Sequence, residues 1–252
     1  MKKRIAILLA PLLFPLTFHA QDNKEKHHIE IPAVSDAGKV IIHTGFSLLY
    51  SEKHEQAAWV AYQLTREETQ KAVERTEKFL PDPAVPTGSA VDSDYRKSGY
   101  DRGHMAPAAD MAWSERSMAE SFYFSNISPQ VPACNRGVWK RLEEQVRTWA
   151  KTYGSVYVVT GPVLSDFLPA IGPDKVSVPD AHFKVILDYT EPDIKGIGFI
   201  VPNKGSDAWT GSFAVSIDSV ESITRIDFFP TLPDHEENVV EKWICLRCWK
   251  WD

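Results

Sequence analysis

The sequence has few of the residues from which cross-linked or zinc-bound folds are built. Only three cysteines occur among its 252 residues, at Cys134, Cys245 and Cys248. One Cys-x-x-Cys pair supplies too few ligands for a structural zinc site, and no thioredoxin-like context surrounds it. Cys245 and Cys248 are therefore either a small disulfide in an oxidising compartment or simply two thiols near the C-terminus, with Cys134 left unpaired.

Long apolar runs are equally scarce. The one run, Ile5–Phe18, follows the basic residues Lys2–Arg4 and contains two prolines. It is shorter than the roughly 20 residues that a transmembrane helix needs, which argues against a retained membrane anchor. The basic start, the short run and the small residue Ala20 predict a secretory signal peptide over residues 1–20. We expect an exported protein, periplasmic or extracellular, with no membrane partner once the signal is removed.

An excess of positive charge is also missing. The formal net charge is −6, and removing Lys2, Lys3 and Arg4 lowers it to −9. An acidic protein repels nucleic acid at long range, which argues against a general polyanion-binding protein. The charge is uneven, however, because residues 96–151 hold nine Lys and Arg against six Asp and Glu, a local net charge of +3. The chemically informative motifs lie in this locally basic stretch.

The remainder of the chain is long enough for one sizeable core. We expect an N-terminal tail and lead-in over residues 21–45 and a single α+β domain over residues 46–252. Runs rich in β-branched and aromatic residues predict strands, and proline or glycine predicts loops. The predicted strands are 57–65, 155–160, 182–189 and 198–201, with a loop at 81–89, a short helix at 114–121 and a compact irregular segment at 96–109.

The clearest predicted helix runs from Cys134 to about Tyr153. Val138, Leu142, Val146 and Trp149 recur at spacings of three and four residues, and Gly154 supplies the stop.

Asp101-Arg102-Gly103-His104-Met105 is the segment most indicative of chemistry. A neutral histidine can accept a proton near pH 7, so His104 suits a general base. Arg102 can grip a phosphate in a bidentate manner. Gly103 is expected to let the backbone bend and approach a substrate closely. A lone histidine in a polar loop is more often an ordinary surface residue, so these residues need support from elsewhere.

That support lies about thirty residues downstream, where Asn126, Gln130 and Asn135 gather in a stretch interrupted by prolines. Amide oxygens are hard ligands that suit Mg²⁺. On the following helix Arg136, Glu143 and Arg147 fall within roughly 40° of one another at 100° per residue, beside the apolar stripe. They can face a cleft. The simpler alternative is an ordinary i, i+4 ion pair on a solvated helix.

The motifs D-R-G-H-M-A-P-A, F-Y-F-S-N-I-S-P-Q and N-R-G-V-W-K-R-L-E resemble those of the DNA/RNA non-specific endonucleases of the ββα-metal (His-Me finger) superfamily. The resemblance is closer to the endonuclease G branch than to the Serratia-type secreted nucleases. It covers roughly residues 57–230, and the motifs match in identity, order and spacing.

The resemblance implies a role for each site residue. His104 matches the general base, Asn135 the only direct protein ligand of magnesium, and Glu143 the acidic residue that orients water at the metal. Arg102 and Arg147 match phosphate-contacting arginines. The other expected substrate or supporting residues are Asn126, Gln130, Arg136 and, as a candidate for an upstream arginine, Arg75.

The resemblance also implies a fold and a reaction. We expect a ββα-metal finger core, with the histidine on a strand of a small hairpin and the metal-binding asparagine on the crossing helix, and a central, mainly antiparallel sheet flanked by helices. The expected cofactor is Mg²⁺, with Mn²⁺ or another divalent ion as alternatives. The expected partners are DNA and RNA, cleaved to 5′-phosphate and 3′-hydroxyl ends. Homodimers are common in the family, so a homodimer is one expectation.

Three alternatives stay open at this point. A nucleic-acid-binding protein that has lost catalysis would lack the base or the metal amide, whereas this chain has both His104 and Asn135. A phosphodiesterase or phosphatase for smaller substrates would need a closed pocket. A non-catalytic secreted binding module would leave the order of the motifs unexplained.

Overall fold

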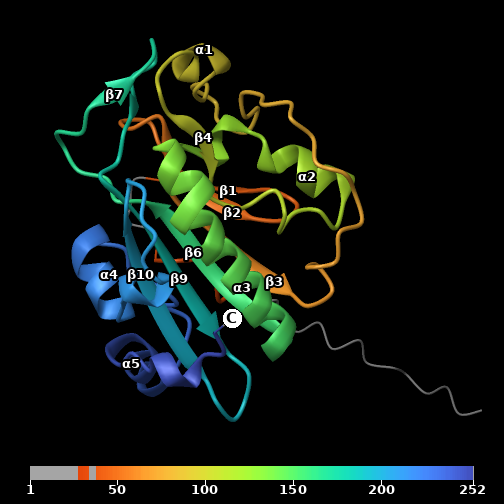
Figure 1. The fold of residues 1–252 in the computed structure, drawn as a ribbon, viewed down its shortest axis with the longest axis vertical. Coiled ribbons are helices and arrows are strands. Elements are labelled where there is room, and N and C mark those ends of the chain that lie inside the picture. The colour runs from red at the N-terminus through yellow and green to blue at the C-terminus, as the bar shows by residue number, and fades with distance from the viewer. Residues whose placement is uncertain (1–27, 34–37, 252) are drawn as a thin grey trace, which may run out of the picture.

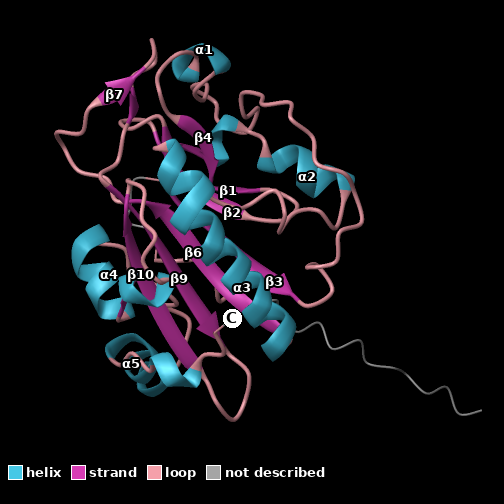
Figure 2. Cartoon of the chain, viewed as in Figure 1, coloured by secondary structure: helices cyan, strands magenta, loops and turns pink. Residues whose placement is uncertain are grey.

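A seven-stranded antiparallel sheet forms the centre of the molecule (Figures 1 and 2). The computed structural model describes residues 28–33 and 38–251, so the predicted signal peptide lies outside the described residues. The strand order is β1-β2-β3-β6-β9-β10-β11. The strands are β1 Val40–Ile42, β2 Ser47–Ser51, β3 Gln56–Thr65, β6 Ser155–Pro162, β9 Ala181–Asp188, β10 Lys195–Pro202 and β11 Ala214–Val215. The predicted α+β class with a mainly antiparallel sheet is confirmed.

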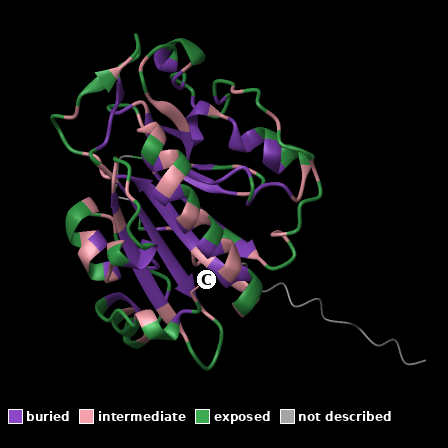
Figure 3. Cartoon of the chain, viewed as in Figure 1, coloured by how far each residue is buried: buried purple, intermediate pink, exposed green. Residues whose placement is uncertain are grey.

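Helix α3, Lys140–Tyr153, covers one face of this sheet. Its side chains Leu142, Val146 and Trp149 are buried in one cluster with residues of β6, β9 and β10. The predicted apolar spacing therefore marks the face that packs inward, and burial of that face supplies the main driving force for docking the helix. Figure 3 shows the buried strands beneath a helix that is mixed in exposure.

Two further helices, α4 Ile217–Thr224 and α5 Asp234–Lys242, cover the opposite face. Ile217, Val220 and Val240 cluster there with alternate residues of β9, such as Phe183 and Val185. Successive side chains of a strand point to opposite faces, so the neighbouring residues of β9 point toward α3. A strand buried on both sides explains why the predicted strands read as nearly continuous apolar runs.

A separate two-stranded sheet carries the histidine motif. Strand β4, Asp101–His104, pairs antiparallel with β5, Ile127–Gln130, and His104 lies opposite Ile127. The prediction of an irregular segment over 96–109 is therefore wrong for these four residues. The short helices α1 Asp92–Tyr95 and α2 Glu115–Ser121 and the 3₁₀ turn Phe124–Asn126 flank this pair.

The predicted helix from Cys134 is confirmed in its main part and wrong in its first turn. Cys134–Trp139 forms a wide π-type turn, and Gly137 departs from helical geometry, with φ −108° and ψ −108°. The regular helix begins at Lys140. A π-type turn rotates the residues that precede it relative to those that follow, so Asn135 does not share the angular register of a continuous α-helix.

The remaining elements lie at the periphery. They are β7 Ala170–Ile171 and β8 Val176–Ser177, and 3₁₀ turns at Thr210–Phe213 and Leu246–Cys248. A disulfide joins Cys245 and Cys248, and Cys134 is free and buried. Within residues 28–33 and 38–251, no helix has both the length and the apolar character to cross a membrane.

Candidate active site

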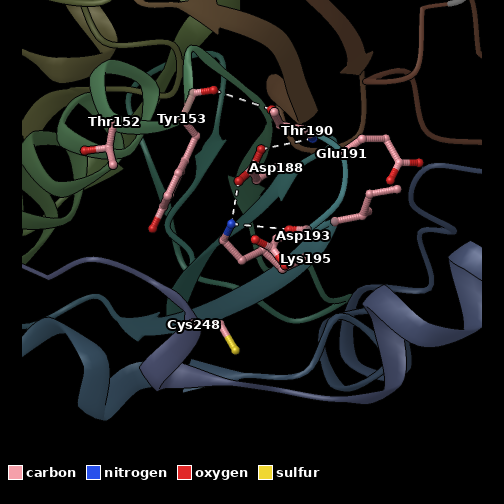
Figure 4. A pocket seen from close by; sticks show the side chains of 9 residues that line it. Thr152, Tyr153, Asp188, Thr190, Glu191, Asp193, Lys195 and Cys248 are labelled. Carbon is pink, nitrogen blue, oxygen red and sulfur yellow. Dashed lines mark hydrogen bonds and ion pairs between the residues drawn. The ribbon is translucent and has the colours of Figure 1, made fainter.

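A hollow of about 600 Å³ where β9 ends and β10 begins is a poor site for a phosphate ester (Figure 4). Three carboxylates line it, those of Asp188, Glu191 and Asp193, whereas Lys195 is the one basic residue in its lining. Lys195 is already paired with Asp188, at 2.5 Å between Nζ and Oδ2. The net negative lining repels a phosphodiester.

A second cleft, of about 360 Å³, has a net positive lining and contains most of the predicted site residues. It lies between β4, the loop that follows β4, and the helical segment from Asn135 to Arg147. Its lining comprises Arg75, Arg102, His104, Pro107, Ala108, Ala109, Asn135, Arg136, Lys140, Glu143 and Arg147. Seven of the nine residues predicted from the sequence are in this lining, and Asn126 and Gln130 are not.

His104 is held between aromatic rings at the end of β4. Its ring centroid lies 4.7 Å from that of Phe122, in an edge arrangement, and 5.6 Å from that of Phe79. Only 8% of the residue is exposed, and Nε2 has no hydrogen-bond partner among the described residues. Burial, helped by the nearby charge of Arg75, lowers the pKa of His104 to about 3. The imidazole is therefore neutral at pH 7 and able to accept a proton.

The carboxylate of Asp101 fixes Asn135. Asn135 Nδ2 donates to Asp101 Oδ2 at 2.9 Å. A carboxylate accepts only from the amide nitrogen, so this bond determines which way the amide points and leaves Oδ1 as its ligand atom. Arg136 binds the same carboxylate with Nε and Nη2, at 2.8 and 2.6 Å. Asp101 thus joins β4, three residues before His104, to the start of the helix.

Asp110 holds Arg147 at the far side of the cleft. Arg147 Nη1 donates to Asp110 Oδ1 at 2.7 Å, and the Tyr62 hydroxyl donates to Oδ2 at 2.8 Å. Asp110 is fully buried and Arg147 is mostly buried. Because both carboxylate oxygens are bonded, the arginine has a fixed position from which its other nitrogens can meet a phosphate.

Glu143 lies between positive and negative neighbours on the cleft side of α3. Burial, together with the charge of Asp110, raises the pKa of Glu143 to about 7, although Lys184 and Arg147 act in the other direction. Lys184 is fully buried, and its Nζ donates to Thr160 Oγ1 at 3.1 Å. Burial lowers the pKa of Lys184 to about 8. The carboxyl of Glu143 is thus poised to ionise as positive charge enters the cleft.

Arg75 and Arg102 complete the basic lining from two other segments. The Arg75 guanidinium lies 4.9 Å from the centre of the Phe122 ring, and that of Arg102 lies 5.2 Å from the centre of the Phe79 ring. Arg102 also forms an ion pair with Asp92. Both arginines therefore stack on the two rings that enclose His104. This places Arg75, which comes from a loop, next to the predicted base.

Asn126 has a supporting position rather than a place in the cleft lining. Its Oδ1 accepts from the backbone N–H of Ala106 at 2.9 Å, and its Nδ2 donates to the carbonyls of Ala106 and Ser121. These bonds hold the chain just after His104 against the end of α2. All of the amide's bonds are to the backbone, so its contribution is to position the loop.

Gln130 lies buried beneath β4. Its side chain crosses Gly103, where an added Cβ would come within 2.2 Å of the amide oxygen. An added Cβ at Gly103 would therefore collide with the Gln130 side chain of β5, and the expectation that this glycine also lets the backbone approach a substrate stays a prediction. Both polar atoms of the Gln130 amide lack partners among the described residues.

Three charged residues that support the cleft from outside its lining were not predicted, and neither was Lys140 within the lining. Asp101 and Asp110 anchor Asn135, Arg136 and Arg147. Both lie within ten residues of His104, so their presence in one short segment with the histidine was an available signal. Lys184 belongs to β9, and it comes close to Glu143 only because α3 packs on the sheet that contains β9. No local pattern in the sequence identifies it.

The donor atoms of the cleft fit a hard divalent cation. Asn135 offers an amide oxygen whose orientation is set by Asp101, and Glu143 in the same lining offers a carboxylate. Magnesium prefers a few oxygen ligands of this kind and keeps most of its waters. No cysteine lines the cleft, and His104 is enclosed by aromatic rings, so the site lacks the set of nitrogen and sulfur donors typical of zinc.

Comparison with known proteins agrees with the motifs. The family model described as DNA/RNA non-specific endonuclease matches residues 24–235. The chain is 39% identical over 207 residues to the mitochondrial nuclease EXOG of Danio rerio, covering 75% of this chain and 60% of that protein. It is 36% identical over 205 residues to mitochondrial endonuclease G of Homo sapiens, covering 74% of this chain and 68% of that protein.

A solved structure and a cyanobacterial relative extend the comparison. The structure of EndoG in complex with EndoGI superposes with a TM-score of 0.76 at 33% identity, covering 82% of this chain and 91% of that chain. A nuclease of Nostoc sp. is 33% identical over 215 residues, covering 80% of this chain and 77% of that protein. The chain thus spans about 60% of the length of the Danio rerio relative and most of the length of the others.

The buried state of His104 predicts a pH-dependent contribution to stability. In the unfolded chain the imidazole has its ordinary pKa of 6.5, and in the folded chain about 3. The stability that the buried neutral ring contributes is therefore fully present above pH 6.5. It is lost as the pH falls toward 3, because over this range only the unfolded state takes up the proton. Between pH 7.5 and pH 5, wild type should lose about 1–2 kcal/mol more unfolding free energy than His104→Asn.

Urea denaturation of the two proteins at both pH values measures this difference, since the other titrating groups are common to both. His235→Asn, at an exposed histidine, is the matched control and should follow wild type. Equal losses in wild type and His104→Asn would show that the ring is not buried in its neutral form.

Proposed function

This chain belongs to the DNA/RNA non-specific endonuclease family, and from that premise we propose that it is a metal-dependent endonuclease. It hydrolyses phosphodiester bonds of DNA and RNA without sequence specificity. One observation carries the proposal. The neutral ring of His104, the oriented amide of Asn135 and four arginines line the same cleft.

His104 serves as the general base. Its ring is neutral because burial disfavours the imidazolium, and it accepts the proton of the attacking water. A base with a pKa near 3 is weak in the free protein. The negative charge of a bound phosphodiester favours the protonated ring and raises that pKa, so the base becomes stronger once the substrate is in place. The stacking contacts with Phe79 and Phe122 keep the ring in position.

The arginines bind and orient the phosphodiester. Arg147 is fixed by Asp110, and Arg75 and Arg102 are stacked on the aromatic rings beside the base. Guanidinium groups held in place before the substrate arrives stabilise the charge that grows on the phosphoryl oxygens. Contacts to phosphate carry no sequence information, which supports low sequence specificity.

Asn135 would hold the metal, for which we propose Mg²⁺, and Glu143 would orient water at it. When bound, the cation supplies positive charge to the phosphoryl transition state and to the leaving 3′ oxygen. Asp101 keeps the ligand oxygen of Asn135 directed by binding its amide nitrogen. Glu143 ionises as positive charge approaches and then accepts hydrogen bonds from water at the site. Because the 3′ oxygen is the leaving group, cleavage leaves 5′-phosphate and 3′-hydroxyl ends.

Substitutions at the base and at the metal ligand should abolish most of the activity. We expect His104→Ala and Asn135→Ala each to cleave plasmid DNA and RNA at least about 100-fold more slowly than wild type in Mg²⁺, because a positioned base contributes roughly 10²–10⁴-fold. Excess EDTA should stop wild-type cleavage. Initial rates from gel assays measure all three effects.

The chain offers a matched control for each substitution. His235→Ala and Asn238→Ala change the same residue types in the exposed part of α5 and should cleave as wild type does. Undiminished cleavage by either cleft variant, or by wild type in EDTA, contradicts the mechanism.

We also propose that the protein is exported. The support is the basic start, the short apolar run and the small residue at position 20. Expression of the full chain in a Gram-negative host should yield a periplasmic protein whose sequence begins near Gln21. A protein that keeps Met1 and stays in the cytoplasm would refute export and leave the assignment of the cleft unaffected.

A further inference from the structure

Five carboxylates gather where α4 and α5 lie side by side on the sheet face opposite α3 (Figure 1). Asp218 and Glu221 belong to α4, Glu237 and Glu241 belong to α5, and Asp227 lies on the connection between the two helices. This group is called the α4–α5 carboxylate cluster below. It lies across the sheet from the cleft that contains His104, so it is not part of the site described above.

Glu241 is at the centre of the cluster. Carboxylate oxygens of Asp218, Glu221 and Glu241 lie within 4.8 Å of one another, and so do those of Asp227, Glu237 and Glu241. Glu241 is the member common to both groups. Oxygens this close to one another surround a point that a single cation can share.

The environment of Glu241 is an independent indication that a ligand is bound there. Only 8% of the residue is exposed, and its Oε1 is buried with no hydrogen-bond partner among the described residues. A buried acceptor without a partner costs about 1–3 kcal/mol, and more when it is charged, so native structures nearly always satisfy such groups. The side chain is directed into a cluster of other carboxylates, and no described side-chain donor compensates this oxygen.

The cluster also has no basic side chain paired with it in the part of the chain that the structure describes. None of the ion pairs among the described residues involves any of its five members. Glu221 accepts one hydrogen bond, from the backbone N–H of Phe228 at 2.8 Å. Burial and the neighbouring carboxylates raise the pKa of Glu221 to about 7 and that of Glu241 to about 8. This mutual repulsion is what a bound cation would remove.

We propose that the α4–α5 carboxylate cluster is a structural calcium site. Ca²⁺ binds six to eight oxygen ligands, including monodentate and bidentate carboxylates, in flexible geometry. Two groups of three carboxylates that share Glu241, from two helices and their connection, supply such oxygens, and waters would complete the coordination. Mg²⁺ is smaller, requires octahedral geometry and keeps several waters, whereas zinc favours nitrogen and sulfur ligands. The bound ion would fasten α4 to α5 over β10.

Thermal unfolding in the presence of different ions tests the site. At pH 7.5, 10 mM CaCl₂ should raise the unfolding midpoint of wild type above its value in EDTA by about 3–8 °C, as ligand binding to the folded state alone requires. In Asn135→Ala, which lacks the proposed magnesium ligand of the cleft, the same concentration of MgCl₂ should raise the midpoint by much less than CaCl₂ does. Asn135→Ala, which removes the amide of the cleft, should keep the full response to calcium, so failure of the endonuclease proposal would not affect this result.

Variants of the cluster locate the ion. Glu241→Gln should abolish the response to calcium and, because Glu241 with its pKa of about 8 is already mostly uncharged at pH 7.5 without the ion, should unfold in EDTA at a midpoint close to that of wild type. Asp234→Asn changes the same charge on an exposed residue of α5 outside the cluster and should respond as wild type does. If Glu241→Gln does not fold, the half-buried Glu237→Gln serves in its place.

Three results would overturn the proposal. They are an unchanged midpoint in 10 mM Ca²⁺, equal rises with Mg²⁺ and Ca²⁺ in Asn135→Ala, and a rise of wild-type size in the Glu241→Gln or Glu237→Gln protein.

Discussion

The geometry of the cleft depends on the carboxylate of Asp101. It accepts hydrogen bonds from Asn135 and Arg136, and it stands three residues before His104 on the same short strand. One side chain therefore sets the distance between the strand that carries the base and the helical segment that carries the metal amide. A two-stranded sheet of four-residue strands has little stability by itself, so this bond and the packing of β5 under Gly103 are what hold the base and the ligand in one site.

A second constraint is the removal of charged groups from water. The Asp110 carboxylate and the Lys184 ammonium are fully buried near the cleft, and each is held by a specific partner, Arg147 or Thr160. Burial of Glu143 and Lys184 themselves raises the pKa of Glu143 and lowers that of Lys184, toward neutral pH, and the charge of Asp110 adds to the rise at Glu143. Such groups respond to an incoming anion or cation more strongly than solvated ones do. Burial likewise raises the pKa of Glu241 on the other face of the sheet.

The sequence was most informative where a local pattern reflects burial. The spacing of Leu142, Val146 and Trp149 predicted α3, and the apolar runs predicted strands β3, β6, β9 and β10, because each pattern records which face is covered. Strand β4 escaped prediction from local pattern because four residues around a glycine contain no periodicity, and only the family resemblance placed His104 on a strand. The π-type turn before α3 was equally invisible, and the position of Arg75 beside His104 depends on how a loop folds over Phe122. The family motifs indicated the site, whereas its supporting acids emerged only from the structure.

Chemical rescue tests most directly the central claim, that the neutral ring of His104 accepts the proton of the attacking water. His104→Gly leaves a cavity between Phe79 and Phe122 that free imidazole can enter. The account predicts that added imidazole restores part of the plasmid cleavage by His104→Gly in Mg²⁺, with a saturating dependence on its concentration, and restores none by Asn135→Ala. If imidazole binds in the cavity and the rate of His104→Gly stays unchanged, the ring is not the base and the account is contradicted.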